Sequence, residues 1–419
     1  MRILPKAIMV SAALLLATPA MAVEKVVWWD FLSGGDGVRM KELIQKFNAE
    51  HQGKIEIEAT TLEWGTPFYT KVQTSAAIGQ GPDISTYHLS RLQSGVAAKT
   101  LAPIDLKELE AIGLKDSDYP PNSIDAATVD GQRYGVPFDV HGLVLYYNKA
   151  ILKDLGALGP DGKPMGIDTL EGWHAVLEKA KAAGKTAVVI EASKGDPRTG
   201  YTLFGQQGGE LLTGAKFLQG DNLGKMAKAV EEMGSWVSNG WTPPYINYQT
   251  MVGAFAGGEA AFMINGAWEL PTMQAEAAKG TGFDFGMMII PGWLGKPATW
   301  VDSHAFVIPD NKGATVTPEK HAAVLEVIRW MNANSLPWAG AGHIPAYLPT
   351  RQSAEFKALT PQSDYAGFID NAFYMPKSPL TGADSAWEQN WGGLIAGAAN
   401  GEGGAQDAVE QLRDTMNGL

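Results

Sequence analysis

The hydrophobic residues near the start of the chain follow two different periods, and each period predicts an element. Residues 26–31 (Val-Val-Trp-Trp-Asp-Phe) are almost all apolar, as in a buried strand. Apolar residues then recur three and four positions apart, on one helical face, at Met40, Leu43, Ile44 and Phe47. Residues 55–59 alternate isoleucine or alanine with glutamate, which is the period of a strand. A strand, a helix and a strand in this order build a parallel sheet, so we predict an α/β protein.

The same two periods return along the rest of the chain, without an internal repeat. Further strands are predicted at residues 143–147, 187–190 and 305–308. Further helices are predicted at residues 170–183, 223–237, 318–332 and 405–416. Asp168 or Thr169 is placed to cap the first of these helices.

The first 22 residues have the pattern of a secretory signal peptide. Arg2 and Lys6 precede an apolar stretch at residues 7–17, and an Ala-Met-Ala site ends at Ala22. The apolar stretch is shorter than the roughly 20 residues that a membrane-spanning helix needs. We therefore expect export with cleavage after Ala22, and a mature protein that is not inserted in a membrane.

Composition narrows the function and the compartment. The chain has 419 residues, which suits two large domains or three ordinary ones. Without the signal peptide it has 31 basic and 45 acidic residues, a formal charge of −14, which argues against nucleic acid as a partner. It has no cysteine, so disulfides, thiol catalysis and a lipid-modified N-terminal cysteine are excluded. An exported, acidic protein without a lipid anchor is expected in a Gram-negative periplasm.

Catalytic and cofactor motifs are largely missing. The Gly-x-Gly at 35–37 is followed by Met40 where a dinucleotide-binding loop needs glycine, and the Gly-Lys-Thr at 184–186 lacks the upstream glycine of a phosphate loop. No serine lies in G-x-S-x-G, and none of the spacings between the seven histidines matches a metal motif. We therefore predict a protein without cofactor or metal that is not an enzyme. A secreted glycosidase stays open as the alternative, because its two carboxylates need no fixed spacing.

Aromatic and polar residues at predicted strand ends are the strongest sign of a binding site. Tryptophans stand beside acidic residues or histidine at 28–30, 268–269 and 300–304. An indole face suits the C–H face of a sugar, and carboxylates and imidazoles suit its hydroxyl groups, although core packing is the other interpretation of each tryptophan. Open α/β sheets bind ligands at the carboxyl ends of their strands, which favours the binding interpretation.

Several polar candidates carry the same two interpretations. Asp36 precedes a helix and either meets a ligand there or caps the helix. Asp139 and His141 lie on one face of an extended segment. His88 and His343 are either ligand contacts or buried structural histidines.

Five stretches, in the same order, resemble the extracellular solute-binding proteins of ABC importers that bind sugars. They are Gly-Pro-Asp-Ile at 81–84, the D-G-x-x-Y-G-x-P and Y-Y-N-K block at 130–149, F-x-x-G-x-A-A-F-M at 255–263, the strand and proline at 283–291, and G-x-x-P at 342–345. Each motif alone is degenerate, but together they cover almost the whole mature chain.

This resemblance implies a two-lobe α/β fold of the periplasmic binding protein type II, with the ligand in the cleft between the lobes. The implied N-terminal lobe comprises residues 23–139 plus 302–342, and the C-terminal lobe residues 142–299 plus 345–419. The chain would cross between them near 139–143, 299–302 and 343–345. A hinge would close on the ligand, and the closed form would deliver it to an ABC permease with a cytoplasmic ATPase. We expect the protein to act as a monomer.

Within the family the chain is most similar to glucose-binding members. They have a Trp-Trp pair before a Gly-rich acidic loop, a histidine after the Pro-Asp strand, a histidine two residues after a polar residue, a tryptophan in a G-x-W segment and an Asp-Ser before a strand. The candidate ligand-binding residues are Trp28, Trp29, Asp36, Trp64, His88, Asp139, His141, Trp268, Asp302 and His343. The ligand implied is a neutral monosaccharide or short glycoside. An anion such as glycerol phosphate is the rival ligand, which the acidic candidates disfavour because buried phosphate needs Arg or Lys.

Overall fold

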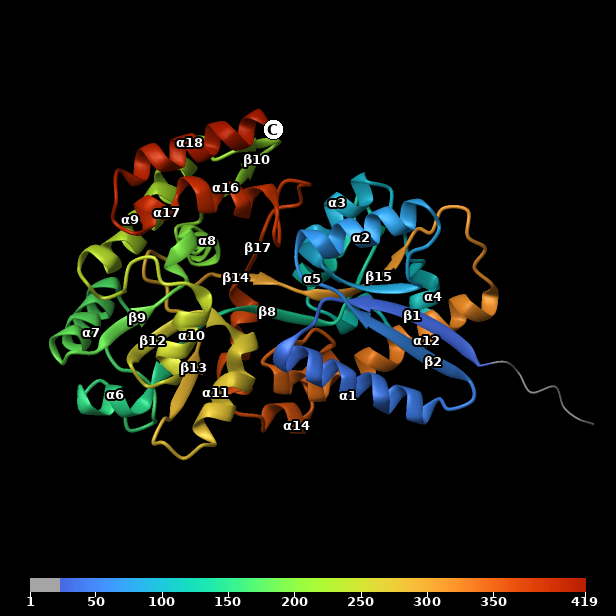
Figure 1. Cartoon of the computed structure of the whole chain (residues 1–419), viewed down its shortest axis with the longest axis horizontal. Coiled ribbons are helices and arrows are strands. Elements are labelled where there is room, and N and C mark those ends of the chain that lie inside the picture. Colours follow the sequence, from blue (N-terminus) through green and yellow to red (C-terminus); the bar gives the residue numbers. More distant parts are fainter. Residues whose placement is uncertain (1–22) are drawn as a thin grey trace, which may run out of the picture.

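The computed structural model describes residues 23–419, so the predicted signal peptide lies outside the described residues. These residues form two α/β lobes side by side, each built on its own sheet (Figure 1). This confirms the predicted fold class. Within residues 23–419, no helix is long and apolar enough to cross a membrane.

The first lobe has a sheet with strand order β2-β1-β3-β15-β4, and β7 pairs with β15. The strands are β1 (Glu24–Asp30), β2 (Ile55–Thr61), β3 (Ile84–His88), β4 (Leu101–Ala102), β7 (Val136–Pro137) and β15 (His304–Pro309). Helices α1 (Gly34–Glu50) and α12 (Pro318–Ala333) lie on one side of this sheet, and α2 (Thr66–Ala77) and α3 (Leu92–Ala97) lie on the other (Figure 1).

The predicted strand–helix–strand unit at the start of the chain is confirmed. β1 and β2 pair in parallel, and α1 joins them. The helix buries the apolar face that its sequence predicts, which is Met40, Leu43, Ile44 and Phe47, together with Gly37. The alternation in β2 is weaker than predicted, because Ile57 is its only buried residue.

The second lobe has a sheet with strand order β17-β14-β8-β12-β9, and both β13 and β16 pair with β8. Its strands are β8 (Asp139–Asn148), β9 (Thr186–Val189), β12 (Ala260–Gly266), β13 (Phe285–Met288), β14 (Thr299–Asp302), β16 (Ile344–Pro345) and β17 (Ala372–Tyr374). Its main helices are α7 (Leu170–Ala182), α8 (Pro197–Gln206), α9 (Asn222–Ser238), α10 (Tyr248–Ala256), α11 (Leu270–Ala277), α16 (Ala386–Leu394) and α18 (Ala405–Gly418). The Thr169 hydroxyl caps α7 by accepting a hydrogen bond from the Gly172 N–H, so Thr169 and not Asp168 is the cap.

Shorter elements complete the two lobes. The short helices are α4 (Leu106–Ala111), α5 (Pro121–Ala126), α6 (Lys149–Asp154), α13 (Leu348–Arg351), α14 (Ala354–Lys357), α15 (Gln362–Tyr365) and α17 (Ala396–Ala399). Two hairpins pair β5 (Thr128–Val129) with β6 (Gln132–Arg133) and β10 (Leu212–Thr213) with β11 (Lys216–Phe217).

The chain passes between the two sheets at places that lie close together. β7 belongs to the first sheet and β8 to the second, with Phe138 between them. β14 and β15 likewise belong to different sheets, with Ser303 between them. β16 pairs with the start of β8, directly after a 3-10 helix (Leu336–Ala341) that packs on α1 of the first lobe. These passages bring residues of three distant segments to one junction.

Candidate functional site

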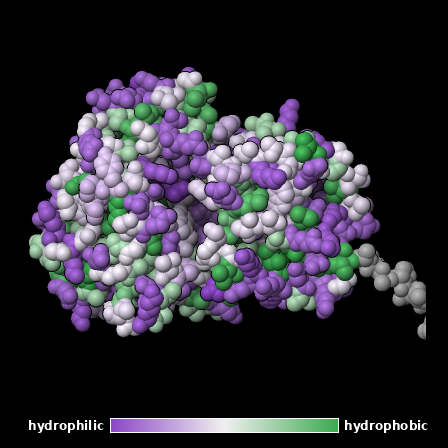
Figure 2. Space-filling model, in the orientation of Figure 1, coloured by the Kyte–Doolittle hydropathy of each residue, from purple (hydrophilic) through white to green (hydrophobic). Residues whose placement is uncertain are grey.

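A cleft of about 1020 Å³ opens between the lobes and is lined by both of them. Figure 2 shows it as a hollow with hydrophilic residues in and around it. The first lobe contributes the loop from the end of β1 into α1, and the second lobe contributes the start of α8, the segment after β12 and the start of α16. A cavity of this size is at the upper end of small-molecule sites.

Six of the ten predicted site residues line this cleft, and four do not. The six are Asp36, Trp64, His88, His141, Trp268 and His343. The four that the structure places elsewhere are Trp28, Trp29, Asp139 and Asp302.

Trp28 and Trp29 lie away from the cleft because both sit within β1 and not at its end. Trp28 is fully buried in the core of the first lobe, where its Nε1–H donates to the Thr86 hydroxyl at 2.9 Å and its ring meets Phe306 edge-on. Trp29 points to the opposite face, under the Lys71 ammonium. For Trp28 the core-packing interpretation is the correct one.

Asp139 and Asp302 are buried beneath the cleft wall. Asp302 accepts hydrogen bonds from the backbone N–H and the hydroxyl of Ser90, and burial raises its pKa to about 6. Asp139 is fully buried behind the histidines that do face the cleft. Both carboxylates therefore hold other groups in place.

Two tryptophans of the second lobe meet at a right angle in the cleft. The rings of Trp268 and Trp300 are 6.3 Å apart, with an angle of 89° between them. Trp268 Nε1–H donates to the Tyr248 hydroxyl at 2.7 Å, and that hydroxyl donates to the Glu269 carboxylate at 2.6 Å. The indole is therefore held in one orientation from behind.

Gly266 is needed for the position of Trp268. A Cβ atom at Gly266 would lie 2.1 Å from the Trp268 ring. The space beside Gly266 is filled by the indole of this tryptophan and is not open to a ligand.

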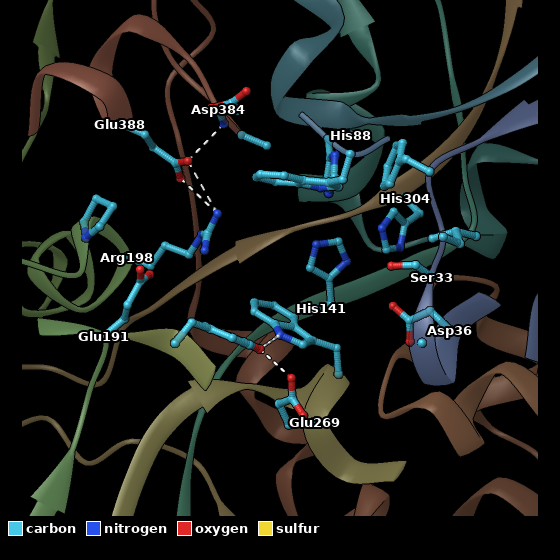
Figure 3. A pocket seen from close by; sticks show the side chains of 18 of the residues that line it. Ser33, Asp36, His88, His141, Glu191, Arg198, Glu269, His304, Asp384 and Glu388 are labelled. Atoms are coloured by element: carbon cyan, nitrogen blue, oxygen red, sulfur yellow. Dashed lines mark hydrogen bonds and ion pairs between the residues drawn. The ribbon is translucent and has the colours of Figure 1, made fainter. Parts of the chain in front are cut away.

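Histidines from four segments gather at the floor of the cleft, and Figure 3 labels three of them, His88, His141 and His304. The His141 ring lies 4.4 Å from His304, 5.3 Å from His343 and 5.6 Å from His88, measured between ring centroids. Asp139 organises two of them, since it accepts hydrogen bonds from His141 Nδ1 at 3.0 Å and from His304 Nδ1 at 2.7 Å. A carboxylate only accepts, so the proton of each ring is on Nδ1 and Nε2 is the free nitrogen.

The electrostatics of this group follow from burial and close partners. Burial lowers the pKa of His141 to about 4, with a further contribution from the His304 charge, and burial also holds the pKa of His88 well below its usual range. Burial opposes the charge on His343, but Asp36 and Asp139 outweigh it and raise its pKa. Burial opposes the charge on Asp139 as well, and the neighbouring histidines hold its pKa well below the usual range. Near neutral pH, His88 and His141 are therefore hydrogen-bond acceptors and not cations.

Charged residues on the second lobe line the other side of the cleft. Arg198 lies 5.0 Å from the centre of the Trp300 ring and 3.4 Å from the Glu388 carboxylate, and Glu388 also accepts from the Asp384 N–H at 2.9 Å (Figure 3). Burial would lower the pKa of Arg198, but Glu388 and Asp196 outweigh it and raise it. This guanidinium is thus neutralised within the protein.

The alternative role of Asp36 as a helix cap is wrong. Ser33 occupies the position before α1, and Asp36 lies in the first turn of the helix. Its Oδ1 lies 3.1 Å from His343 Nε2, across the floor of the cleft.

Sequence reasoning missed several residues that line the cleft. They are His304, Trp300, Arg198, Lys194, Glu191, Tyr248, Glu269, Asp384 and Glu388. Trp300 and His304 stand in the aromatic and polar stretch at 300–304, from which the predicted site residues include only Asp302. His304 reaches the site because β15 pairs with β3 opposite His88, which no local pattern indicates.

Residues 42–362 match the family model of bacterial extracellular solute-binding proteins. This match spans more than half of the chain and gives the family. The chain belongs to the bacterial extracellular solute-binding protein family.

Two curated relatives share about a quarter of their aligned residues with this chain. A lactose-binding protein of Rhizobium radiobacter is 25% identical over 64% of this chain, and the chain spans 62% of that protein's length. A maltotriose-binding protein of Pyrococcus abyssi is 24% identical over 88% of this chain and 76% of its own length.

Solved structures share the fold at low sequence identity. The GacH receptor of Streptomyces glaucescens, solved unliganded and with acarbose, superposes with a TM-score of 0.78 at 17% identity, over 94% of this chain and 97% of its own. The maltose/maltodextrin-binding domain of Bdellovibrio bacteriovorus, bound to maltotriose, has a TM-score of 0.74 at 19% identity, over 94% and 98%. Similarity at this level of identity shows the fold.

Proposed function

We propose that the protein binds a neutral sugar, a monosaccharide or a short glycoside, in the interlobe cleft and delivers it to an ABC permease. The observation that carries the proposal is the pair of Trp268 and Trp300, whose rings meet at a right angle in the cleft, opposite the histidines of the cleft floor. The curated lactose- and maltotriose-binding relatives support the class of ligand.

The chemistry of the two walls suits a pyranose ring. The Trp268 face offers an apolar platform for its C–H groups, as aromatic rings do at polar binding sites. The free Nε2 atoms of His141 and His304 offer acceptors for its hydroxyl groups, because Asp139 holds the proton on Nδ1 of both rings. A ring bound here would touch groups from both lobes.

The cleft has room for more than one sugar ring. Its volume of about 1020 Å³ is at the upper end of the range for small-molecule pockets. Trp64, which is 44% exposed, lies in the same cleft and gives a further ring a surface to pack on. A disaccharide or trisaccharide therefore suits the cleft better than a single hexose.

An anionic ligand is less suitable, even though Lys194 and Arg198 line the cleft. Arg198 is already paired with Glu388. Other carboxylates that face the cleft are Asp36, Glu191, Glu269 and Asp384. A phosphate would meet the negative charge of these carboxylates, because the Arg198 guanidinium is already paired with Glu388.

The transport role completes the proposal. The lobes would comprise residues 23–139 plus 302–342 and residues 142–299 plus 345–419, and they would close about the three passages between the sheets. The mature, monomeric protein would work in the periplasm after loss of residues 1–22. Its partners would be a membrane permease and the cytoplasmic ATPase of the importer.

A sugar panel tests binding against catalysis. Protein stripped of ligand is mixed with glucose, lactose, maltose, maltotriose and glycerol phosphate, and the melting temperature and the recovered ligand are measured. We expect saturable stabilisation by at least one neutral sugar, which is recovered unchanged. Cleavage of the sugar would favour a secreted enzyme, and stabilisation by glycerol phosphate alone would favour an anion-binding protein.

A further inference from the structure

Four chelating side chains meet where the chain passes between the two sheets. They are Asp139 and His141 on β8, His304 at the start of β15, and His343 just before β16. One donor atom from each residue can be chosen so that all four lie within 4.8 Å of one another. All four residues are at most 5% exposed.

The cluster is already arranged around one carboxylate. Asp139 Oδ1 accepts from His141 Nδ1 and from the His304 backbone N–H at 2.9 Å, and Oδ2 accepts from His304 Nδ1 and from Trp338 Nε1 at 2.6 Å. An ion bound to the Asp139 carboxylate and to these Nδ1 atoms would take the place of the Nδ1 protons, and each neutral ring would then carry its proton on Nε2.

His343 gives a second, independent indication of a binding site. Its side chain is 1% exposed, and both ring nitrogens are buried without a hydrogen-bond partner among residues 23–419. Its Nδ1 lies 3.5 Å from Asp139 Oδ2 and its Nε2 lies 3.1 Å from Asp36 Oδ1, but neither contact has hydrogen-bond geometry. The ring is fixed by stacking on Trp338, with centroids 4.8 Å apart and 10° between the planes. Asp36 and Asp139 balance the charge of this imidazole, but neither of its nitrogens has a partner in hydrogen-bond geometry, and a bound ion would supply one.

We propose that Asp139, His141, His304 and His343 bind one divalent transition-metal ion of the Zn²⁺ class. Three imidazole nitrogens and one carboxylate oxygen are a donor set that suits Zn²⁺, Co²⁺, Ni²⁺ or Cu²⁺. Mg²⁺ and Ca²⁺ require oxygen donors and do not fit this set. Metal–ligand bonds of about 2.0–2.1 Å place tetrahedral donors about 3.3–3.4 Å apart, so the side chains have to move inward by about 1 Å.

The position of the ion has a structural consequence. It would tie together the segments in which the chain passes from one lobe to the other, and three of its ligands also line the cleft. The ion would therefore stabilise the hinge and form part of the cleft floor. This inference stands on the cluster alone and does not depend on the identity of the transported solute.

The test uses the full mature chain, treated with EDTA and dialysed. Calorimetry with ZnCl₂ and visible absorption with CoCl₂ are compared for the wild type, H343Q, H141Q and a triple control, H51Q/H174Q/H321Q. The control histidines each pair with a glutamate outside the cluster. We expect one ion per chain, the d–d bands of four-coordinate cobalt, at least tenfold weaker binding in H343Q and H141Q, and unchanged binding in the control.

The outcomes separate this inference from the sugar proposal. Absence of saturable binding in the wild type, or loss of binding in the triple control only, would overturn the metal site. The wild-type cobalt spectrum decides the matter even if a cluster variant does not fold. If EDTA-treated protein binds sugar but takes up no metal, the proposed function stands and the metal site is wrong. If the protein binds metal but no sugar, the metal site stands and the proposed function is wrong.

Discussion

Asp384 of the second lobe and Thr66 of the first lobe are joined across the rim of the cleft. Asp384 Oδ2 accepts hydrogen bonds from the Thr66 backbone N–H at 2.5 Å and from its hydroxyl at 2.7 Å. Asp384 also lines the cleft. The carboxylate is therefore placed to stabilise the lobes in the arrangement that encloses a ligand.

Loss of this contact should weaken sugar binding. A hydrogen bond to a charged group contributes about 1.5–3 kcal/mol, so we expect Asp384→Ala to raise the dissociation constant about tenfold or more. Thr66→Ala keeps the backbone donor and should cost less. Calorimetry on both variants and on the double variant forms a thermodynamic cycle.

The cycle shows whether the two residues act together. If they do, the double variant binds sugar as weakly as Asp384→Ala alone. Asp414→Ala serves as the control, because Asp414 pairs with the adjacent Arg413 and its side chain is 68% exposed. Fully additive losses would mean that Asp384 touches the ligand without the help of Thr66.

Trp268 should contribute to binding far more than to stability. Removing a desolvated aromatic anchor costs on the order of 2–4 kcal/mol, which is about 30- to 1,000-fold in dissociation constant. Trp268→Ala should therefore nearly abolish calorimetric sugar binding and lower the melting temperature of the free protein only slightly. Trp330→Ala is the matched control, since Trp330 packs on Phe47 in the first lobe, and it should do the opposite. Affinity of Trp268→Ala within about threefold of the wild type, or roughly 0.7 kcal/mol, would place Trp268 outside the site.

Gly266→Ala tests the role of the Trp268 indole face without changing Trp268 itself. The added Cβ would occupy the space of the indole, so Trp268 has to leave its position against Tyr248. We expect a loss of affinity comparable to that of Trp268→Ala, together with a changed intrinsic fluorescence spectrum. Unchanged affinity would show that the orientation of the indole is not important.

Asp196 should make stability depend on pH. Burial raises its pKa to about 6, so between about pH 4 and 6 the folded protein holds a proton that the unfolded chain releases. The contribution of Asp196 to the free energy of unfolding therefore rises as the pH falls from 7 to 4. Above pH 7 the charged carboxylate lowers the free energy of unfolding by on the order of 2–3 kcal/mol.

The substitution Asp196→Asn removes this cost and suits the backbone. Asp196 has φ +31°, a region that asparagine tolerates. In chemical denaturation we expect a stabilisation of about 1–2 kcal/mol at pH 8 and little gain at pH 4.5. Asp161→Asn, at an exposed position, is the control. An equal effect of Asp196→Asn at both pH values would show that the Asp196 carboxyl does not titrate between them in the folded protein.

Ligand should bring the lobes together. Within residues 23–419 the chain passes from one sheet to the other at the segments described above, so we expect rotation about these segments. Small-angle scattering at saturating sugar should give a smaller radius of gyration than the free protein, whereas a sugar that does not bind should leave it unchanged. An unchanged radius at saturation with the binding sugar would rule out closure.

Local patterns predicted these elements because α1 buries one face and β8 is buried on both. The spacing of Met40, Leu43, Ile44 and Phe47 gave α1, and the apolar run at 143–147 gave β8. The resemblance gave the arrangement of these elements as two lobes, which periodicity alone does not contain.

The site was only partly predictable, because its geometry depends on pairing between distant strands. Trp28 was chosen although strand alternation turns it into the core, and the alternation alone does not say which face meets the cleft. His304 was missed because only its pairing with His88 across β15 and β3 brings it to the floor. Arg198 follows Asp196, whose positive φ turns the chain into α8, and no pattern in the sequence indicated where its side chain would lie.

The most direct test of the central claim is a crystal structure with the sugar that gives the largest thermal stabilisation. The account predicts electron density for a pyranose ring on the Trp268 face, with hydroxyl groups within hydrogen-bond distance of His141 or His304 and contacts from both lobes. An empty cleft at a saturating sugar concentration, or sugar density confined to another surface, would contradict it.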